Sequence, residues 1–137
     1  MGFNFSEVLI IDDDQAIMLL ESNLLRRMKF HKPIRWFKNG MEGIEFLKSK
    51  PQDDSIHSKS IILLDIDMPV MDGWEFLREF EKLNPTITSK YKIIVRTSSH
   101  DPNDSLKAMR IGSISEFMNK PVTTEQLMAV FRKLVLI

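Results

Sequence analysis

The chain has 137 residues, of which 43% are hydrophobic and 28% charged, a composition typical of a soluble globular domain. Its 19 Lys and Arg balance its 19 Asp and Glu, so no overall field favours nucleic acid or an anionic membrane surface. The absence of cysteine excludes disulfides, thiolate nucleophiles and cysteine-ligated metals. Runs between charged residues are too short to span a bilayer, and no secretory signal is present. We expect one cytoplasmic domain over residues 1–137.

Strand and helix patterns alternate along the chain. Apolar runs predict strands at residues 8–11, 34–37, 61–64, 92–97 and 115–119. Helical spacing of apolar residues predicts helices over residues 15–30, 41–50, 73–83 and 103–111, and a last helix from residue 124. The polar segments 51–60 and 84–90 are predicted as surface loops.

The first and last helices carry the clearest apolar faces. The face of the first is predicted to hold Ile17, Leu20, Leu24 and Met28. The face of the last is predicted to hold Leu127, Val130, Phe131, Leu134 and Ile137. Strands that alternate with helices in this way predict right-handed crossovers and a parallel sheet with both faces covered.

Polar residues follow the strands of this predicted sheet. Asp12, Asp13 and Asp14 come after the first strand, Asp65 and Asp67 after the third, Thr97, Ser98 and Ser99 at the end of the fourth, and Lys120 and Pro121 after the fifth. Because ligands of such sheets bind outside the carboxyl ends of the strands, we expect these side chains to meet in one crevice.

A crevice that gathers several carboxylates needs a cation, because like charges at short range raise one another's pKa values. Only oxygen ligands are on offer, which favours Mg²⁺ over Ca²⁺ or Mn²⁺. A bound Mg²⁺ readily shares its ligand shell with a phosphoryl group. The nearby lysine and hydroxyl groups suit phosphoryl oxygens, and a carboxylate can accept the phosphoryl group itself.

At these residues the chain resembles the response-regulator receiver domains of two-component signalling. The resemblance covers nearly the whole chain and rests on residues 8–14 (VLIIDDD), residues 63–73 (LLDIDMPVMDG), the pair Thr97-Ser98 and the pair Lys120-Pro121. Residues 71–77 (MDGWEFL) are most similar to small stand-alone receivers of the chemotaxis-regulator type, including those that serve phytochrome-type kinases. The resemblance implies a flavodoxin-like, doubly wound α/β fold with five parallel strands in the order 2-1-3-4-5 and five helices.

The resemblance also implies a role for each site residue. Asp65 would accept the phosphoryl group. Asp13 would bind Mg²⁺ directly, Asp12 would assist through water, and Asp67 would offer its backbone carbonyl. Thr97 and Lys120 would contact phosphoryl oxygens, with a cis peptide bond before Pro121 aiming the lysine. Phe117 would be an aromatic switch residue that follows the movement of the threonine.

The implied function is a phosphorylation-dependent switch and not a turnover enzyme, although the domain would catalyse its own phosphorylation and dephosphorylation. The donor would be a bacterial sensor histidine kinase or a histidine phosphotransfer protein. The fourth predicted helix, the fifth strand and the last helix would form the signalling surface. The downstream partner is an unidentified protein or a second copy of the chain in a homodimer, with no nucleic acid or membrane involved.

Three residues near the predicted crevice stand out. Arg96 occupies a position where receivers usually carry an apolar residue, so its charge must reach solvent or a partner.

Asp67 and Ser99 lie beside the expected path of attacking water. We therefore hypothesise that they set the lifetime of the phosphoryl group on Asp65.

Other readings of the same residues remain. Asp14 is expected to cap the first helix, and Phe117 could serve core packing alone. Asp65 and Asp67 also match the Asp-x-Asp of haloacid-dehalogenase-type phosphatases, although Pro69 stands where a Thr or Val is expected. A third possibility is a docking module of the same fold that is never phosphorylated, against which the complete acidic set argues.

Overall fold

The computed structural model describes residues 2–51, 59–134 and 136. Five parallel strands form one sheet in the order β2-β1-β3-β4-β5. The strands are β1 (Phe5–Ile11), β2 (Ile34–Phe37), β3 (Lys59–Leu64), β4 (Tyr91–Thr97) and β5 (Ile114–Asn119). The helices are α1 (Gln15–Arg27), α2 (Gly40–Lys48), α3 (Gly73–Glu81), α4 (Pro85–Thr88), α5 (Pro102–Met109) and α6 (Thr124–Lys133). This is the flavodoxin-like fold and strand order that the resemblance implies.

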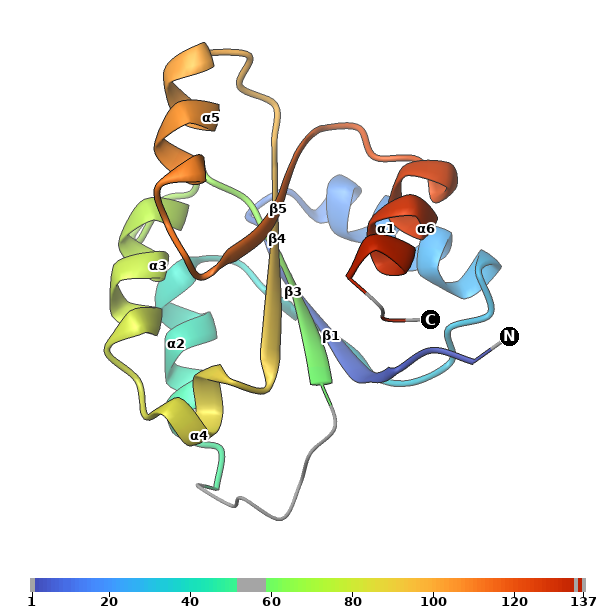
Figure 1. The fold of residues 1–137 in the computed structure, drawn as a ribbon, viewed down its shortest axis with the longest axis horizontal. Helices are drawn as coiled ribbons and strands as arrows, with labels where there is room; N and C mark the ends of the chain where they lie inside the picture. The colour runs from blue at the N-terminus through green and yellow to red at the C-terminus, as the bar shows by residue number, and fades with distance from the viewer. Residues whose placement is uncertain (1, 52–58, 135, 137) are drawn as a thin grey trace.

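The helices cover both faces of the sheet (Figure 1). Helices α2, α3, α4 and α5 lie on one side, and α1 and α6 lie on the other. Alternate side chains of each strand enter one of the two resulting cores, as the period of two requires. On β4, for example, Ile93 and Val95 join the core under α2 and α3, whereas Ile94 joins the core under α1 and α6.

The expectation of five helices is wrong by one. Segment 84–90, predicted as a loop, contains the short helix α4 (Pro85–Thr88). Asn84 caps this helix by accepting from the amide of Thr86, and Pro85 fits its first turn because proline has no amide hydrogen to satisfy there. Four residues are too few for the helical spacing of apolar residues to show in the sequence.

The apolar face of α1 is rotated from the prediction. Leu20, which its spacing assigns to that face, is 41% exposed, and Glu21 is buried instead beside Leu24 and Leu25. A carboxylate is buried only where a partner stabilises its charge, and that partner lies on β4.

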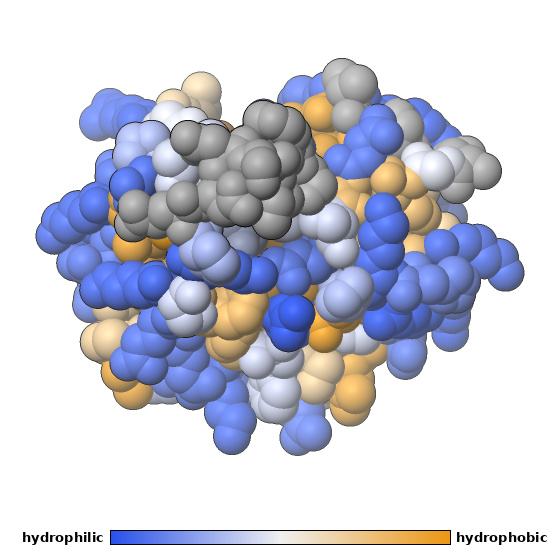
Figure 2. Space-filling view, turned by 90° about the horizontal axis from the view of Figure 1, so that it is seen from below, coloured by the Kyte–Doolittle hydropathy of each residue, from blue (hydrophilic) through white to orange (hydrophobic). Residues whose placement is uncertain are grey.

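Several predicted boundaries shift slightly. Lys59 and Ser60, placed in the loop 51–60, belong to β3, and residues 52–58 of that loop lie outside the described part of the chain. Leu127, Val130 and Phe131 are buried on α6 as predicted, whereas Ile137 lies outside the described residues. None of the described helices combines the length and apolarity that a membrane span requires. Hydrophilic residues cover most of the end of the molecule where the strands begin (Figure 2).

Candidate functional site: an acidic cluster at the carboxyl ends of the strands

Side chains from three strand ends meet at one edge of the sheet. Asp12 and Asp13 follow β1, and Asp65 follows β3. Carboxylate oxygens of these three residues all lie within 4.8 Å of one another. Lys120, which follows β5, reaches the same cluster with its ammonium group, 2.8 Å from Asp12 Oδ2 and 3.2 Å from Asp65 Oδ1. The structure therefore brings these four predicted site residues together.

Backbone contacts fix the position of Asp12. Its amide donates to the carbonyl of Phe37 at 3.0 Å, which continues the pairing of β1 with β2. Its carbonyl accepts from the indole nitrogen of Trp36 at 2.7 Å. Because the main chain is held on both sides, the side chain of Asp12 enters the site from a defined direction.

Close packing of α3 fixes the position of Asp65. The amide of Asp65 donates to the carbonyl of Ile11 at 2.9 Å, and the amide of Gly73 donates to the carbonyl of Ile66 at 2.8 Å. A Cβ atom on Gly73 would lie only 2.5 Å from the carbonyl oxygen of Asp65 and 2.8 Å from the Cα of Ile66. Glycine is thus required there, because it alone lets the start of α3 approach the backbone this closely. The helix predicted over residues 73–83 begins at this glycine, and Asp72 caps it by accepting from the amide of Glu75.

Burial changes the acidity of Asp65. The side chain is almost fully buried, and this burial, followed by repulsion from Asp12, raises the pKa of Asp65 to about 6. Lys120 and Arg96 act in the opposite direction but do not cancel the rise. Asp65 Oδ1 and Asp12 Oδ2 are buried without a hydrogen-bond partner among the described residues, although both lie within ion-pair distance of Lys120.

The chemistry of the cluster suits a divalent cation. Its donor set consists of carboxylate oxygens, which hard cations such as Mg²⁺ prefer. Asp12 and Asp65 are buried, whereas Asp13 is exposed. The Asp65 oxygen without a hydrogen-bond partner is the kind of atom that a metal ion satisfies. On both observations the residues present fit a magnesium ion.

The end of β4 supplies a buried hydroxyl. Thr97 is fully buried, and its Oγ1 accepts from the amide of Ser99 at 3.1 Å. Its carbonyl accepts from the amide of Lys120 at 2.8 Å, so the ends of β4 and β5 are tied together beside the acidic cluster. The peptide bond between Lys120 and Pro121 is cis, as the resemblance implies.

The remaining predicted residues lie around this centre. Asp14 caps α1 by accepting from the amides of Ala16 and Ile17, as expected. Asp67 is exposed, and its carboxylate is outside the group formed by Asp12, Asp13 and Asp65. Its expected contribution through a backbone carbonyl stays a prediction.

Phe117 and Ser99 have defined surroundings. The ring of Phe117 is partly buried and packs against the core under α2 and α3. The hydroxyl of Ser99 donates to Asp104 Oδ2 at 2.7 Å, and the carbonyl of Ser99 accepts from the side-chain amide of Asn119 at 2.8 Å. Ser99 thus belongs to the connection between β4 and α5. Its effect on phosphoryl lifetime stays a hypothesis.

Glu21 is the partner of Arg96 and was not predicted from the sequence. Both side chains are buried, and Arg96 Nε donates to Glu21 Oε2 at 2.9 Å. Arg96 Nη2 also lies 3.1 Å from Asp12 Oδ2, which connects α1 to the acidic cluster. The expectation that Arg96 needs a partner is confirmed. The available signal for Glu21 was a charged residue four positions after Ile17, where a helical face should be apolar.

The family model for the response regulator receiver domain matches residues 8–132. The chain belongs to the response regulator receiver family. Its domain is therefore a receiver domain of two-component signalling, and receiver domains are phosphoacceptor signalling domains.

Solved structures share the fold of this receiver domain. A two-component response regulator from Cytophaga hutchinsonii superposes with a TM-score of 0.81 at 27% identity, covering 96% of this chain and 98% of that one. The bacteriophytochrome response regulator AtBRR superposes with a TM-score of 0.76 at 19% identity, covering 97% and 94% of the two chains. The predicted similarity to stand-alone receivers, including phytochrome-associated ones, is confirmed at the level of the fold.

Curated relatives place the same domain in longer proteins. The sensor histidine kinase CheAY of Helicobacter pylori is 36% identical over 98 residues, which are 69% of this chain and 11% of that protein. The protein-glutamate methylesterase/protein-glutamine glutaminase 1 of Rhodospirillum rubrum is 27% identical over 122 residues. The receiver domain spans only 28% of that enzyme's length, so the likeness concerns the receiver portion.

Proposed function

We propose that this receiver domain is a phosphorylation switch in which Asp65 accepts a phosphoryl group from a phosphohistidine. The observation that carries the proposal is the surroundings of Asp65. Its buried carboxylate lies at a fixed strand end, and its Oδ1 makes no hydrogen bond among the described residues but lies 3.2 Å from the ammonium group of Lys120. The donor is a sensor histidine kinase or a histidine phosphotransfer protein.

The transfer is a displacement at phosphorus. An ionised oxygen of Asp65 forms the new P–O bond, the P–N bond of the phosphohistidine breaks, and its electron pair stays on the imidazole. Lys120 donates to a phosphoryl oxygen and offsets the added negative charge. The hydroxyl of Thr97 donates to another after turning from its contact with the Ser99 amide. Holding these groups in place lets the domain promote its own phosphorylation.

A magnesium ion is the proposed cofactor. Asp13 and Asp65 would hold it through carboxylate oxygens, Asp12 would assist through water, and Asp67 would offer its backbone carbonyl. When bound, the ion supplies positive charge that offsets the charge on the phosphoryl group.

The signal leaves through the surface formed by α5, β5 and α6. Because α4 is an additional short helix, α5 corresponds to the fourth predicted helix, over residues 103–111. Leu106 and Met109 of α5 are apolar and exposed, which suits contact with a partner protein. Phosphorylation shifts the balance between conformations of this surface through Thr97, which ends β4, and through Phe117 of β5, which pairs in register with Val95 of β4.

Acetyl phosphate tests the acceptor directly. The wild-type chain is incubated with acetyl phosphate and Mg²⁺, and its intact mass is followed with time. We expect the addition of one phosphoryl group in the wild type and none in Asp65→Asn. Asp72→Asn is the matched control, because Asp72 caps α3 in the same loop and should leave phosphorylation intact. Modification of Asp65→Asn to the wild-type extent would disprove the assignment.

The phosphatase reading makes a different prediction. A haloacid-dehalogenase-type enzyme would turn over phosphate esters continuously with Asp65 and Asp67. The receiver family match does not favour this alternative. Steady release of phosphate from an ester such as p-nitrophenyl phosphate would support it, whereas a single stoichiometric acyl phosphate supports the switch.

A further inference from the structure

The side chain of Arg96 is a buried cation directly beside the proposed magnesium site. Arg96 lies on β4 immediately before Thr97 and is 0% exposed. Its Nη2 lies 3.1 Å from Asp12 Oδ2. A guanidinium keeps its charge in proteins, so the cluster contains a permanent positive charge from the protein itself.

Glu21 holds this guanidinium from the other side. Arg96 Nε donates to Glu21 Oε2 at 2.9 Å, and Arg96 Nη2 also contacts Glu21 Oε1. Glu21 is 1% exposed, so both partners are removed from water. Arg96 contacts Asp12 directly, whereas Glu21 joins the network through Arg96.

As a result, two protein cations lie beside the carboxylate of Asp12. Its Oδ1 accepts from the amide of Asp14 at 2.9 Å. Its Oδ2 lies 2.8 Å from Lys120 Nζ and 3.1 Å from Arg96 Nη2. Among the described residues, Asp65 Oδ1 has only Lys120 at 3.2 Å as a neighbouring cation, and Asp13 is exposed, so Asp12 is the carboxylate with the most positive charge from the protein beside it.

We propose that Arg96 is a resident cation that lowers the affinity of the acidic site for Mg²⁺ and keeps Asp12 out of direct coordination, while Glu21 limits this effect. This inference rests on the proposed magnesium site. Arg96 is a positioning residue, because it acts through Asp12 and not on the phosphoryl group. A positive charge beside Asp12 repels a divalent ion more strongly than the more remote Glu21 attracts it.

The proposal predicts effects of opposite sign for two substitutions in one network. Glu21→Gln leaves the charge of Arg96 uncompensated, so Mg²⁺ should bind more weakly. The double substitution Glu21→Met with Arg96→Met removes both charges, so Mg²⁺ should bind more tightly. Each change in the dissociation constant is expected to be on the order of tenfold, as expected for a charge change a few ångström from a partly buried ion. A merely structural network would instead loosen the site in both variants.

Isothermal titration of the purified chain with MgCl₂ measures these dissociation constants without phosphorylation. Fluorescence of Trp36, whose indole donates to the carbonyl of Asp12, provides a second readout. The double variant should stay folded, because apolar residues of similar volume commonly replace a buried ion pair without loss of stability. Circular dichroism of every variant checks this.

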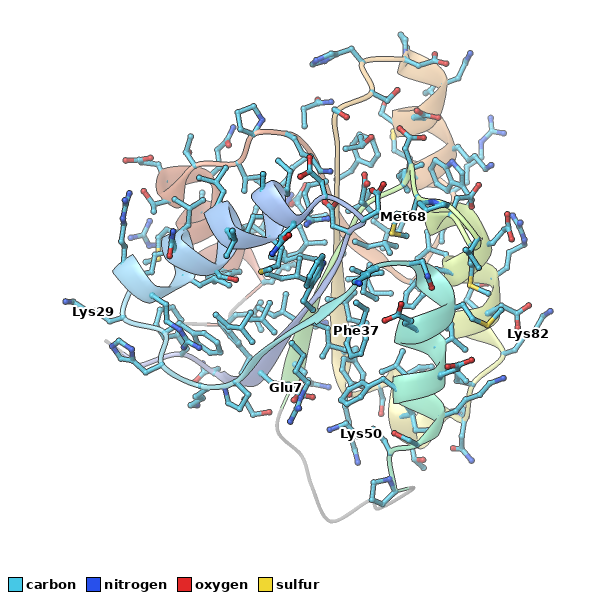
Figure 3. All side chains as sticks on the ribbon, turned by 180° about the vertical axis from the view of Figure 1, so that it is seen from behind. Glu7, Lys29, Phe37, Lys50, Met68 and Lys82 are labelled. Atoms are coloured by element: carbon cyan, nitrogen blue, oxygen red, sulfur yellow. The ribbon has the colours of Figure 1, made fainter. Side chains whose placement is uncertain are left out.

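The matched control is an ion pair at the opposite end of the sheet. Glu7 of β1 lies 2.9 Å from Arg35, and Figure 3 shows Glu7 near Lys50 and far from Met68, which lies in the loop after Asp65. The variant Glu7→Gln with Arg35→Met should retain the Mg²⁺ affinity of the wild type.

The outcomes separate the two proposals. Weaker binding in Glu21→Gln together with tighter binding in the double variant supports the role of Arg96. Any other ordering, including unchanged or uniformly weaker binding, overturns it and leaves the magnesium site standing. If the wild type shows no saturable binding of Mg²⁺, the proposed magnesium site and the role of Arg96 both fail.

Discussion

Charged side chains are buried at both ends of the sheet, but the two ends balance their charges differently. Where the strands begin, Glu7 faces two cations, with Arg35 at 2.9 Å and Lys50 at 3.3 Å. The side chain of Arg35 is 46% exposed there, so solvent screens the pair. Burial, followed by repulsion from Glu7, raises the pKa of Tyr91 and keeps its hydroxyl neutral.

Where the strands end, carboxylates outnumber cations. Asp12, Asp65 and Glu21 share two buried or nearly buried cations, Arg96 and Lys120. The exposed Asp13 adds a further negative charge beside them. This excess is what a divalent ion would neutralise, whereas Glu7 at the other end already has its full complement of positive charge. The two ends thus differ in the sign of their surplus: Glu7 lies between two cations, whereas the negative surplus at the strand ends favours a bound cation.

Breaking one ion pair at each end should give the largest contrast in stability. Arg96→Met leaves Glu21 buried without its cationic partner, so the free energy of unfolding should fall by about 3–5 kcal/mol. Arg35→Met removes a half-exposed partner and should cost about 0–1 kcal/mol. Urea unfolding of both variants measures the difference. Equal losses would show that solvent does not distinguish the two ends.

The pH dependence of stability should also reveal the excess of carboxylates where the strands end. The pKa of Asp65 is raised to about 6 from an ordinary value of 3.8, so between these values the folded state binds more protons than the unfolded state. Stability from this group is therefore present at low pH and is lost as the pH rises toward 6. In EDTA, the free energy of unfolding of Asp65→Asn relative to the wild type should rise by about 2–3 kcal/mol as the pH increases from 4 to 7.5.

Urea unfolding at several pH values tests this sign. Asp72→Asn replaces a carboxylate outside the cluster and serves as the control, which should follow the wild type. If the stability of Asp65→Asn relative to the wild type instead rises as the pH falls, the raised pKa of Asp65 is contradicted.

The smallest expected change in stability concerns Asp13 and Asp14, which are neighbours in one acidic run. Asp14→Ala removes the cap of α1 and should lower stability by about 1 kcal/mol, while phosphorylation by acetyl phosphate remains. Asp13→Ala should abolish Mg²⁺-dependent phosphorylation with little change in stability, because Asp13 is exposed. Thermal unfolding and intact mass measure the two properties. Loss of phosphorylation in Asp14→Ala would assign Asp14 to the chemistry as well.

Local patterns were sufficient for most of the fold and for the centre of the site. The apolar run of residues 61–64 followed by Asp65 predicts a buried strand that ends in a carboxylate, and the structure has that arrangement. Strand order and the cis bond at Pro121 came from the resemblance. The short helix α4 was missed because four residues are too few for a helical period to show.

The sequence by itself determined which residues stand at the ends of the strands, because strand period and chain order are local properties. Only the tertiary structure decided which of them touch. Arg96 and Glu21 are 75 residues apart, and no local pattern states that a helix of one crossover turns its carboxylate toward a strand of another. Packing of α1 against the sheet decides that pairing, because burying either charge alone would cost more free energy than burying the two together.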